Sequence, residues 1–473
     1  MPSRTPDPHH PEGSTMSELD HQVPTREKVL VVGAGPAGLA AAAALQALEV
    51  PFDLVDRAEH VGGIWNPQRE DSPIWSTMEM ISSRAFTQYE DMLQPVSFPE
   101  FLRGEQMAKY LRAYAARYNL TEHFRPGVEV RSAHPFSEGV WQVELSTGEI
   151  TIYRAIIAAH GTSERPYLPD WTQQAPASTR VIHAKDWTSA DGLEGQRVLV
   201  VGSGQSAADI AVDAARRALE VRWSVRTGHW VVPRRIGPVA GDVAAAREPE
   251  LLGPLNERIA SAVVGRLAGD PSEVGLPAPT VPLTQDRVIV SDTVLDRVRE
   301  GRITPIGQVT GITADGAITG SGDGYRPDLI VLATGYRSGA DYLPDDVVPS
   351  TESGAPDLFL GAFPRHRDDL VILGQVRVSG GILPVLVEQA DIAAYLMRAV
   401  IDESGPLEEF RRIRTGGDAS VHAAAESSGR LARLWARRRA AKTAASTQVE
   451  PYVPFTDREQ LLGRLRTVRG LFA

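Results

Sequence analysis

The fold is decided by residues 28–38, which read KVLVVGAGPAG. The first five residues form a short apolar run typical of a buried strand, and three glycines follow with the spacing G-x-G-x-x-G. A strong helix former, LAAAAALQAL, comes next, and the strand-like residues 52–55 end at Asp56. Strand, glycine turn, helix and strand in this order predict a βαβ unit that binds a dinucleotide.

Each glycine of the turn has an expected role. Gly33 permits the tight turn, Gly35 lets the backbone approach a pyrophosphate, and Gly38 allows the helix to pack on the strand. The pyrophosphate is expected at the helix N-terminus, where unpaired N–H groups bind anions. Asp56 is placed to accept hydrogen bonds from an adenosine ribose. The expected ligand contacts of this half are Gly33, Gly35, Pro36, Ala37, Gly38 and Asp56.

A second copy of the pattern begins at residue 197 with RVLVV, continues with the turn GSGQSA at 202–207, and ends in a strand before Arg226. Ala207 replaces the third glycine, and one methyl group still permits close helix packing. Arg226 stands where the first copy has an acid, so it favours a 2′-phosphate and NADPH over NADH; a solvated strand-end charge is the alternative. The expected contacts of this half are Gly202, Gly204, Gln205, Ser206, Arg226 and Thr227.

Two dinucleotide sites on one chain are typical of hydride transfer from a nicotinamide to a flavin. We therefore predict an α/β fold with two Rossmann-like dinucleotide-binding domains, the NADPH domain inserted into the FAD domain. The strand-like residues 156–161 and 329–336 are the expected crossings, with Thr334 and Gly335 near the cofactor. The expected boundaries are a disordered tail at 1–26, an FAD domain at 27–165 and 331–400, an NADPH domain at 166–330, and a helical segment at 401–473.

Composition narrows the function classes. The 473 residues include no cysteine and carry a net charge of −11. The absence of cysteine excludes disulfide scaffolds, iron–sulfur clusters, thiolate zinc sites and a Cys-x-x-Cys redox pair. The acidic balance argues against nucleic-acid binding. We expect a cytoplasmic protein with no metal site and no membrane anchor, and a homodimer is one option for its assembly. Electrons from NADPH must leave through a small molecule, for which O2 is the leading candidate.

Four ordered motifs carry a resemblance to a known family: GAGPAG at 33–38, GGIWN at 62–66, VGSGQSAADIA at 201–211 and LATGY at 332–336. With these motifs, and with residues 97–120, the chain resembles the flavin-containing monooxygenases. They belong to an FAD- and NADPH-dependent class that includes the Baeyer–Villiger enzymes. The similarity extends over most of residues 28–400.

The resemblance implies FAD and NADPH as cofactors, and O2 and a small organic molecule as substrates. NADPH would reduce FAD, the reduced flavin would take up O2 as a C4a-(hydro)peroxide, and a nucleophilic nitrogen or sulfur centre would receive one oxygen atom. Baeyer–Villiger oxygenation of a ketone is the alternative within the class. An NADPH oxidase or a redox-sensing flavoprotein that oxygenates nothing is the alternative from another class.

Two departures from the family pattern bear on the reaction. In ASTRVIHAKDW at 177–187, His183 and the final Trp match the monooxygenase fingerprint F-x-G-x-x-x-H-x-x-x-W/Y, but its Phe and Gly are replaced. Thr188 follows where Baeyer–Villiger members usually have Pro or Asp, which weakens that alternative. Ile81 stands where many N- and S-oxygenating members carry an Asn that helps to hold the flavin peroxide. This second departure keeps the non-oxygenating alternative open.

The resemblance also suggests individual site residues. His183, Arg84 and Asn66 are the catalytic candidates, although each has a structural role as its alternative. Gly63, Trp65 and Gln389 are expected near the flavin, with core packing or helix-surface exposure as the alternatives for the latter two. Arg234 and Arg235 are candidates for the NADPH phosphate site or for a solvated turn. Residues 237–282 are expected to border the substrate entrance, and the basic residues 430–442 to form a solvated or interface helix.

Overall fold

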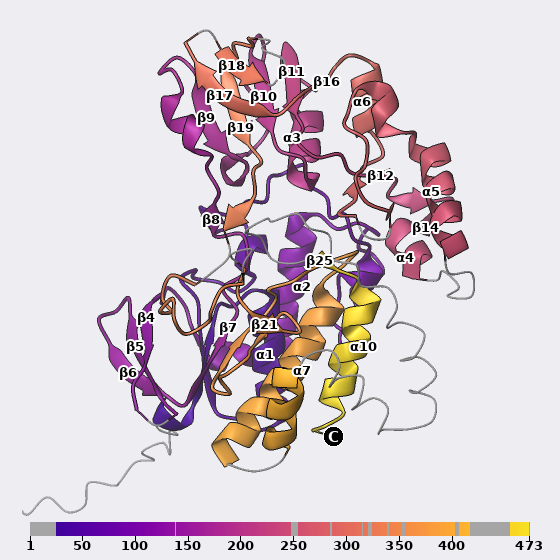
Figure 1. Cartoon of the computed structure of the whole chain (residues 1–473). Helices are drawn as coiled ribbons and strands as arrows, with labels where there is room; N and C mark the ends of the chain where they lie inside the picture. The colour runs from indigo at the N-terminus through magenta and orange to yellow at the C-terminus, as the bar shows by residue number, and fades with distance from the viewer. Residues whose placement is uncertain are drawn as a thin grey trace, which may run out of the picture.

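The computed structural model describes residues 25–472, except 138, 247–253, 284–285, 315, 320–323, 338–339, 352–354, 403–405 and 417–454. In this part the chain forms two parallel five-stranded sheets, seen in the upper and lower halves of Figure 1. The predicted α/β fold with two Rossmann-like units is therefore confirmed. The expected tail is described only from Thr25, in a 3-10 turn, and the basic residues 430–442 lie outside the described residues.

The first sheet has the strand order β23-β7-β1-β2-β3, and all of its pairs are parallel. The chain leaves β1 toward β2 on one side and later adds β7 on the other, so the strand order reverses at β1. Ligands bind in such α/β sheets at the carboxyl ends of the strands beside this reversal. The strands are β1 (Val29–Val32), β2 (Phe52–Val55), β3 (Phe124–Arg125), β7 (Ala155–Ala158) and β23 (Leu370–Ile372).

The second sheet repeats this arrangement, in the order β16-β11-β10-β19-β9. Its strands all lie between β7 and β23 in sequence, so the second unit is inserted into the first. The expected boundary between residues 330 and 331 is wrong in detail, because it divides β19, which pairs along its whole length with β10. The strands are β9 (Arg180–His183), β10 (Arg197–Val201), β11 (Glu220–Ser224), β16 (Thr304–Ile306) and β19 (Leu329–Leu332).

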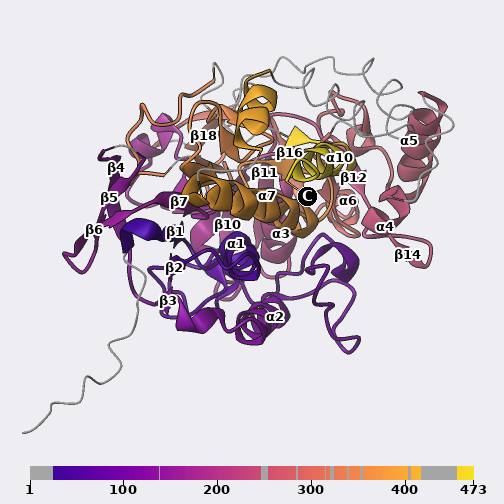
Figure 2. The same cartoon turned by 90° about the horizontal axis from the view of Figure 1, so that it is seen from below.

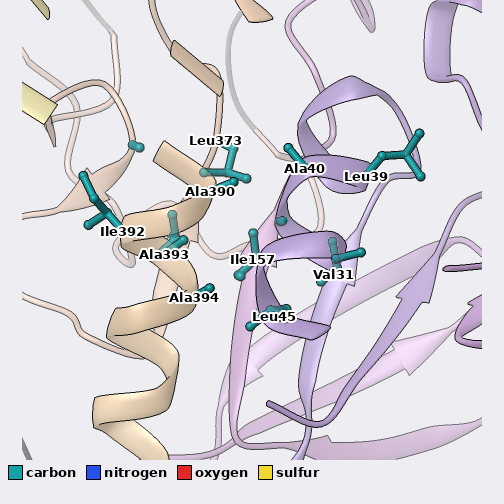
Figure 3. Packing of buried hydrophobic residues seen from close by; sticks show 14 of the residues in the cluster. Val31, Leu39, Ala40, Leu45, Ile157, Leu373, Ala390, Ile392, Ala393 and Ala394 are labelled. Atoms are coloured by element: carbon teal, nitrogen blue, oxygen red, sulfur yellow. The ribbon is translucent and has the colours of Figure 1, made fainter. Parts of the chain in front are cut away.

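Both faces of the first sheet are covered, which explains why its central strands are continuously apolar. Val31 and its neighbours on one face pack against α1 (Pro36–Ala47) and α7 (Leu383–Asp402). Figure 3 shows Ile157 of β7 beside the alanines of these two helices, which allow a close approach. Helix α10 (Arg458–Arg469) packs on α7 and lies next to the C-terminus in Figure 2.

The other face of the first sheet packs on a small antiparallel sheet of β4 (Val130–Pro135), β5 (Trp141–Leu145) and β6 (Ile150–Tyr153). The second sheet is covered in the same way. One face meets α3 (Gln205–Ala214) and α6 (Val294–Arg299), and the other meets the hairpin β17 (Val309–Thr313) and β18 (Gly316–Thr319).

Short elements join and surround the two units. The crossover is a two-stranded ribbon of β8 (Arg165–Pro166) and β20 (Tyr336–Arg337). No helix among the described residues has the length and apolar character needed to cross a bilayer. Other helices of the described residues are α2 (Gly104–Arg117), α4 (Gly241–Ala246) and α5 (Pro254–Ala268), and residues 407–416 are also helical. The remaining strands are β12 (Val231–Val232), β13 (Arg235–Ile236), β14 (Val239–Ala240), β15 (Ile289–Val290), β21 (Leu358–Phe359), β22 (Phe363–Pro364), β24 (Arg377–Val378) and β25 (Phe455–Thr456).

Candidate functional site

The first glycine turn lies at the carboxyl end of β1, against the end of β7. Gly33 has a φ of 104°, and a Cβ added there would lie 2.5 Å from the carbonyl oxygen of Ala159. A Cβ on Gly38 would lie 1.8 Å from the carbonyl oxygen of Gly33. Glycine is therefore required at both positions, by conformation and by the close approach of helix to turn.

A second glycine motif covers this turn. The N–H of Gly62 donates to the carbonyl oxygen of Ala34 at 2.9 Å. Gly35 and Gly63 face each other closely: a Cβ on Gly63, whose φ is 57°, would lie 2.9 Å from the Cα of Gly35. Residues 62–65 thus form a wall over the turn, although about thirty positions separate the two motifs in the sequence.

Asp56 follows β2 and is buried beside the turn. Its Oδ2 accepts the N–H of Ala34 at 2.7 Å, and its Oδ1 accepts the N–H of Ala58 at 2.8 Å. These two bonds fix the orientation of the carboxylate, and each oxygen can still accept a further bond. The carboxylate is held where a ribose can reach it.

These elements enclose a cavity of about 850 Å³ at the carboxyl ends of β1, β2 and β7. Its size is that of a site for a large cofactor. Seven of the residues predicted from the sequence line it: Gly33, Gly35, Pro36, Ala37, Asp56, Gly63 and Trp65. The other predicted residues of the flavin half and the crossover are not among its lining residues: Gly38, Asn66, Arg84, His183, Thr334, Gly335 and Gln389.

A cluster of charged side chains, which we call the ionic cluster, lies at the same cavity and comprises Arg57, Arg69, Asp71, Glu164 and Lys185. Arg69 donates to Asp71 at 2.5 Å and to Glu164 at 2.7 Å, and Arg57 donates to Glu164 at 2.6 Å. Lys185, which follows β9 of the second sheet, lies 3.3 Å from Asp71. Hydrogen bonding to Arg69 holds the pKa of Asp71 well below its usual range. The cluster therefore joins the two units through ion pairs.

The second glycine turn is more open. Its first glycine, Gly202, packs on β19 so closely that a Cβ would lie 2.2 Å from the carbonyl oxygen of Ala333. In contrast, a Cβ on Gly204 would meet no atom within 4 Å, and Ser206 is exposed. Gln205 does not point freely into this space, because its side-chain amide donates to and accepts from the backbone of Val290.

Arg226 and Thr227 lie beside this open turn. Both of their backbone N–H groups donate to the hydroxyl of Ser203, at 3.0 and 3.1 Å. The side chain of Arg226 is exposed, at the end of β11. The structure thus brings the predicted arginine next to the predicted glycine turn, although Arg226 lies 22 positions after Gly204 in the sequence.

Comparison with known proteins supports this geometry. The sequence profile of the flavin-binding monooxygenase-like family matches residues 26–403, more than half of the chain. The chain belongs to this family. It is a monooxygenase that depends on FAD and NADPH.

Two curated relatives and one solved structure illustrate the range of the family. A rice indole-3-pyruvate monooxygenase, YUCCA1, is 29% identical over 337 residues, which are 70% of this chain and 80% of the relative. A chimpanzee dimethylaniline monooxygenase (N-oxide-forming) is 27% identical over 389 residues, 77% and 72% of the two chains. A cyclohexanone monooxygenase mutant from Rhodococcus, bound to NADP+, has a TM-score of 0.66 at 18% identity. The match covers 95% of this chain and 97% of that chain. This last likeness concerns the fold alone.

In this flavin monooxygenase His183 belongs to the crossover between the two units. Its Nε2–H donates to the carbonyl oxygen of Gly335 at 3.1 Å, and its Nδ1 accepts the N–H of Lys185 at 3.1 Å. Tyr336 packs edge-on against the ring. Burial lowers the pKa of His183, so the ring is neutral with both nitrogens in use. This geometry suits a positioning residue rather than a proton carrier.

The other two catalytic candidates also hold backbone. The Nη1 atom of Arg84 donates to three carbonyl oxygens, those of Pro95, Val96 and Phe98, at 2.7–3.2 Å. Asn66 is 1% exposed, donates to the carbonyl oxygen of His60 and accepts the N–H of Gln68. Asn66 therefore fixes the loop that presents Trp65 to the cavity, and Arg84 fixes the loop at 95–98.

Gln389 and the turn at 334–335 act in the same indirect way. The buried amide of Gln389 accepts the N–H of Gly374 at 3.0 Å and donates to the carbonyl oxygen of Leu360. Since Gly374 lines the cavity and Gln389 does not, Gln389 holds a lining residue in place. Thr334 donates to the carbonyl oxygen of Tyr167 in the crossover.

The two arginines at 234 and 235 contact the first unit. Arg234 donates to the carbonyl oxygen of Met80 at 2.8 Å and lies 3.6 Å from Glu79, and Arg235 pairs with Glu100. These contacts hold the segment 79–100, which includes cavity-lining residues, against the inserted unit. The contacts of these two side chains therefore do not support a role in binding the NADPH phosphate.

Sequence reasoning missed two features of the cavity. The first is His160, which follows β7 and lines the cavity together with Tyr342. The position could have been found, because ligands bind beyond the carboxyl ends of parallel strands and the strand itself was recognisable. The second is Ser82, which lines the cavity where Ile81 had been aligned. Ile81 is instead 38% exposed on the surface.

Proposed function

We propose that this enzyme transfers one oxygen atom from O2 to a nucleophilic nitrogen or sulfur centre of a small organic substrate. FAD would occupy the 850 Å³ cavity and NADPH the second glycine turn. The observation that carries the proposal is the chemical contrast between the two ends of the cavity.

The placement of FAD follows from the first turn. The pyrophosphate would bind the N–H groups at the start of α1, and Asp56 would accept from the adenosine ribose. The isoalloxazine would then lie at the opposite end, among the lining residues of the segments 80–87 and 373–386. When bound, FAD accepts a hydride from NADPH and, once reduced, reacts with O2.

The end of the cavity at which the isoalloxazine would lie, which we call the ring end, is lined mainly by apolar side chains. Its lining side chains include Met80, Phe86, Ile382, Leu383 and Leu386. No cation contributes to the described lining from the segments 80–87 and 373–386. The lining cations are Arg57, Arg69 and Lys185 of the ionic cluster, together with Arg131 and Arg165.

This contrast favours one class of substrate. Oxygen insertion next to a ketone passes through an alkoxide, which an active site must stabilise with a cation or convergent donors. An amine or thioether supplies its own lone pair, creates no anion on the substrate and requires no protein base. An apolar end that excludes water also protects a reactive oxygen species from hydrolysis and leakage.

Two hydroxyl groups at this end support oxygenation over a simple oxidase. Thr87 donates to the carbonyl oxygen of Ser83 at 2.6 Å, so the Ser82 hydroxyl, 3.0 Å away, is the donor to Thr87. Both Ser82 and Thr87 line the cavity. These hydroxyls place polar oxygen atoms beside Ile81, and they would act there as acceptors, because both of their protons are used within the protein.

The experiment uses ¹⁸O2 with the purified holoenzyme and NADPH. We offer N,N-dimethylaniline, methyl phenyl sulfide and cyclohexanone separately, and measure the product mass, NADPH consumption and H2O2. The proposal predicts an N-oxide or a sulfoxide that carries one ¹⁸O atom. A lactone from cyclohexanone as the favoured product would contradict the substrate class, and H2O2 equal to NADPH consumed with all three compounds would contradict oxygenation.

A further inference from the structure

His160 occupies a special place in the first unit. It follows β7 at the point where the strand order reverses, and its backbone lies against the first glycine turn. A Cβ on Gly33 would lie 3.4 Å from the backbone nitrogen of His160. The residue lines the large cavity.

The two ring nitrogens of His160 differ in their surroundings. Nδ1 lies 3.3 Å from the hydroxyl of Tyr342, whose ring stands edge-on to the imidazole at 5.9 Å between centroids. Nε2 is buried and has no hydrogen-bond partner among the described residues. A buried polar group without a partner is costly, and in a binding cavity it indicates a partner supplied by the ligand.

The position of the ring proton follows from Tyr342. Burial raises the pKa of Tyr342 well above its usual range, so its hydroxyl keeps its proton and can donate to Nδ1. Burial also lowers the pKa of His160 to about 4, so the neutral ring carries its one proton on Nε2. The reverse arrangement, with Nδ1–H donating to Tyr342, would leave both the tyrosine proton and Nε2 without partners. His160, a residue that lines the cavity, therefore carries an unused N–H donor.

Backbone contacts place this donor at the adenosine end. The N–H of Val128 donates to the carbonyl oxygen of Asp56 at 2.9 Å, and residues 128–131 line the cavity. The N–H of Ala133, on the same strand as Val130, donates to the carbonyl oxygen of Tyr342 at 2.7 Å. Asp56, the start of β4 and the His160–Tyr342 pair thus border one end of the cavity.

We propose that His160 and Tyr342 form a binding pair for the adenosine monophosphate half of FAD. The Nε2–H of His160 donates to an oxygen of that half, and Tyr342 holds the imidazole in the required tautomer and orientation. The pair rests on the placement of FAD in this cavity made above. It adds a side-chain donor to the backbone N–H groups and the Asp56 carboxylate that we assign to the binding of FAD.

The test compares FAD with FMN, which lacks the adenosine monophosphate half. Apoprotein is titrated with each flavin, and affinity is measured by the change in flavin fluorescence. His160→Leu should weaken FAD binding roughly 10- to 100-fold, the range for a hydrogen bond to a charged group, and leave FMN binding unchanged. His160→Gln, which retains an N–H donor, should restore part of the loss. Tyr342→Phe should weaken FAD binding by roughly 2- to 10-fold.

Two controls separate the possible failures. A histidine that only supports the fold would lower the melting temperature of the apoprotein and weaken both flavins alike, whereas we expect an apoprotein melting temperature that is unchanged or raised in His160→Leu. Gly35→Ala tests the cavity itself. If Gly35→Ala weakens FAD binding and His160→Leu does not, the pair is wrong; if neither variant does, the placement of FAD in this cavity is wrong.

Discussion

The two glycine turns are similar in sequence, yet they create different surroundings. The first is roofed by residues 62–65 and opens into a deep cavity of about 850 Å³, where Asp56 is buried. The second presents Gly204 and Ser206 to open space, with the exposed Arg226 at its side. Under the proposed function, one sequence pattern serves two purposes: the deep cavity suits a cofactor that stays, and the open turn suits one that must enter and leave during each turnover.

The largest effect is expected from matched substitutions in the two turns. Gly35→Ala places a methyl group between the turn and the pyrophosphate, so FAD affinity should fall by more than about 100-fold and the protein should purify without colour. Gly204→Ala should leave the FAD content unchanged and raise only the KM for NADPH. Flavin absorbance after purification and steady-state kinetics measure both. Loss of FAD in Gly204→Ala, with retention in Gly35→Ala, would reverse the assignment of the two turns.

Arg226→Ala tests the specificity of the open turn. Removal of a charge-assisted contact to the 2′-phosphate should raise the KM for NADPH by roughly 10- to 100-fold. The KM for NADH should remain unchanged, because NADH lacks that phosphate. Arg216→Ala removes another exposed arginine from the same unit and serves as the control. An unaltered preference for NADPH in Arg226→Ala would show that Arg226 is only a solvated charge.

Ser82→Ala tests the contribution of the Ser82 hydroxyl to oxygen transfer at the ring end of the cavity. The loss of this hydroxyl, with its contact to Thr87, should increase the fraction of NADPH electrons that appear as H2O2 by several-fold, on the scale of one neutral hydrogen bond. Ile81→Ala changes the neighbouring exposed side chain and should leave that fraction unchanged. H2O2 is measured with the substrate present at saturation. An effect in Ile81→Ala but not in Ser82→Ala would favour the original alignment of this loop.

A smaller effect is expected from pH on the apoprotein. Burial lowers the pKa of His160 to about 4 from an unfolded value of 6.5, so protons bind preferentially to the unfolded chain. The stabilisation is present above pH 6.5 and is lost as the pH falls toward 4. The charged groups that act on this ring are Glu164, Arg165 and Asp341.

Urea unfolding at pH 7.5 and pH 5 measures this effect. The midpoint should fall at pH 5 in the wild type and fall less in His160→Gln. The exposed His134 provides the control, and His134→Gln should behave as the wild type. An equal fall in His160→Gln and the wild type would remove His160 as a source of the pH dependence.

The parts that the sequence predicted correctly are those encoded locally. In each turn, glycine spacing, the preceding strand and the following helix are contiguous, so Gly33, Gly202 and their neighbours were found where the structure has them. Trp65 was also found, because GGIW is itself a local motif. The sequence pattern likewise predicted the insertion of one unit into the other.

The side chains that depend on distant loops were not predicted. Arg84 resembled a catalytic cation, but its partners are carbonyl oxygens of residues 95–98, which no spacing rule connects to it. The ionic cluster unites Arg57, Asp71, Glu164 and Lys185 across more than 100 positions of the chain. The boundary expected between residues 330 and 331 divides β19, which pairs with β10 and β9 of the second sheet, because strand pairing is a tertiary property.

The central claim, a proposed FAD site in the deep cavity beside an open NADPH site, is tested most directly by the release of both cofactors from one sample. The holoenzyme is saturated with NADP+, passed rapidly through a desalting column, and the flavin and nicotinamide that remain bound are measured. The account predicts a full equivalent of FAD on the protein and NADP+ in the small-molecule fraction. FAD lost as readily as NADP+, or NADP+ retained while FAD leaves, would contradict it.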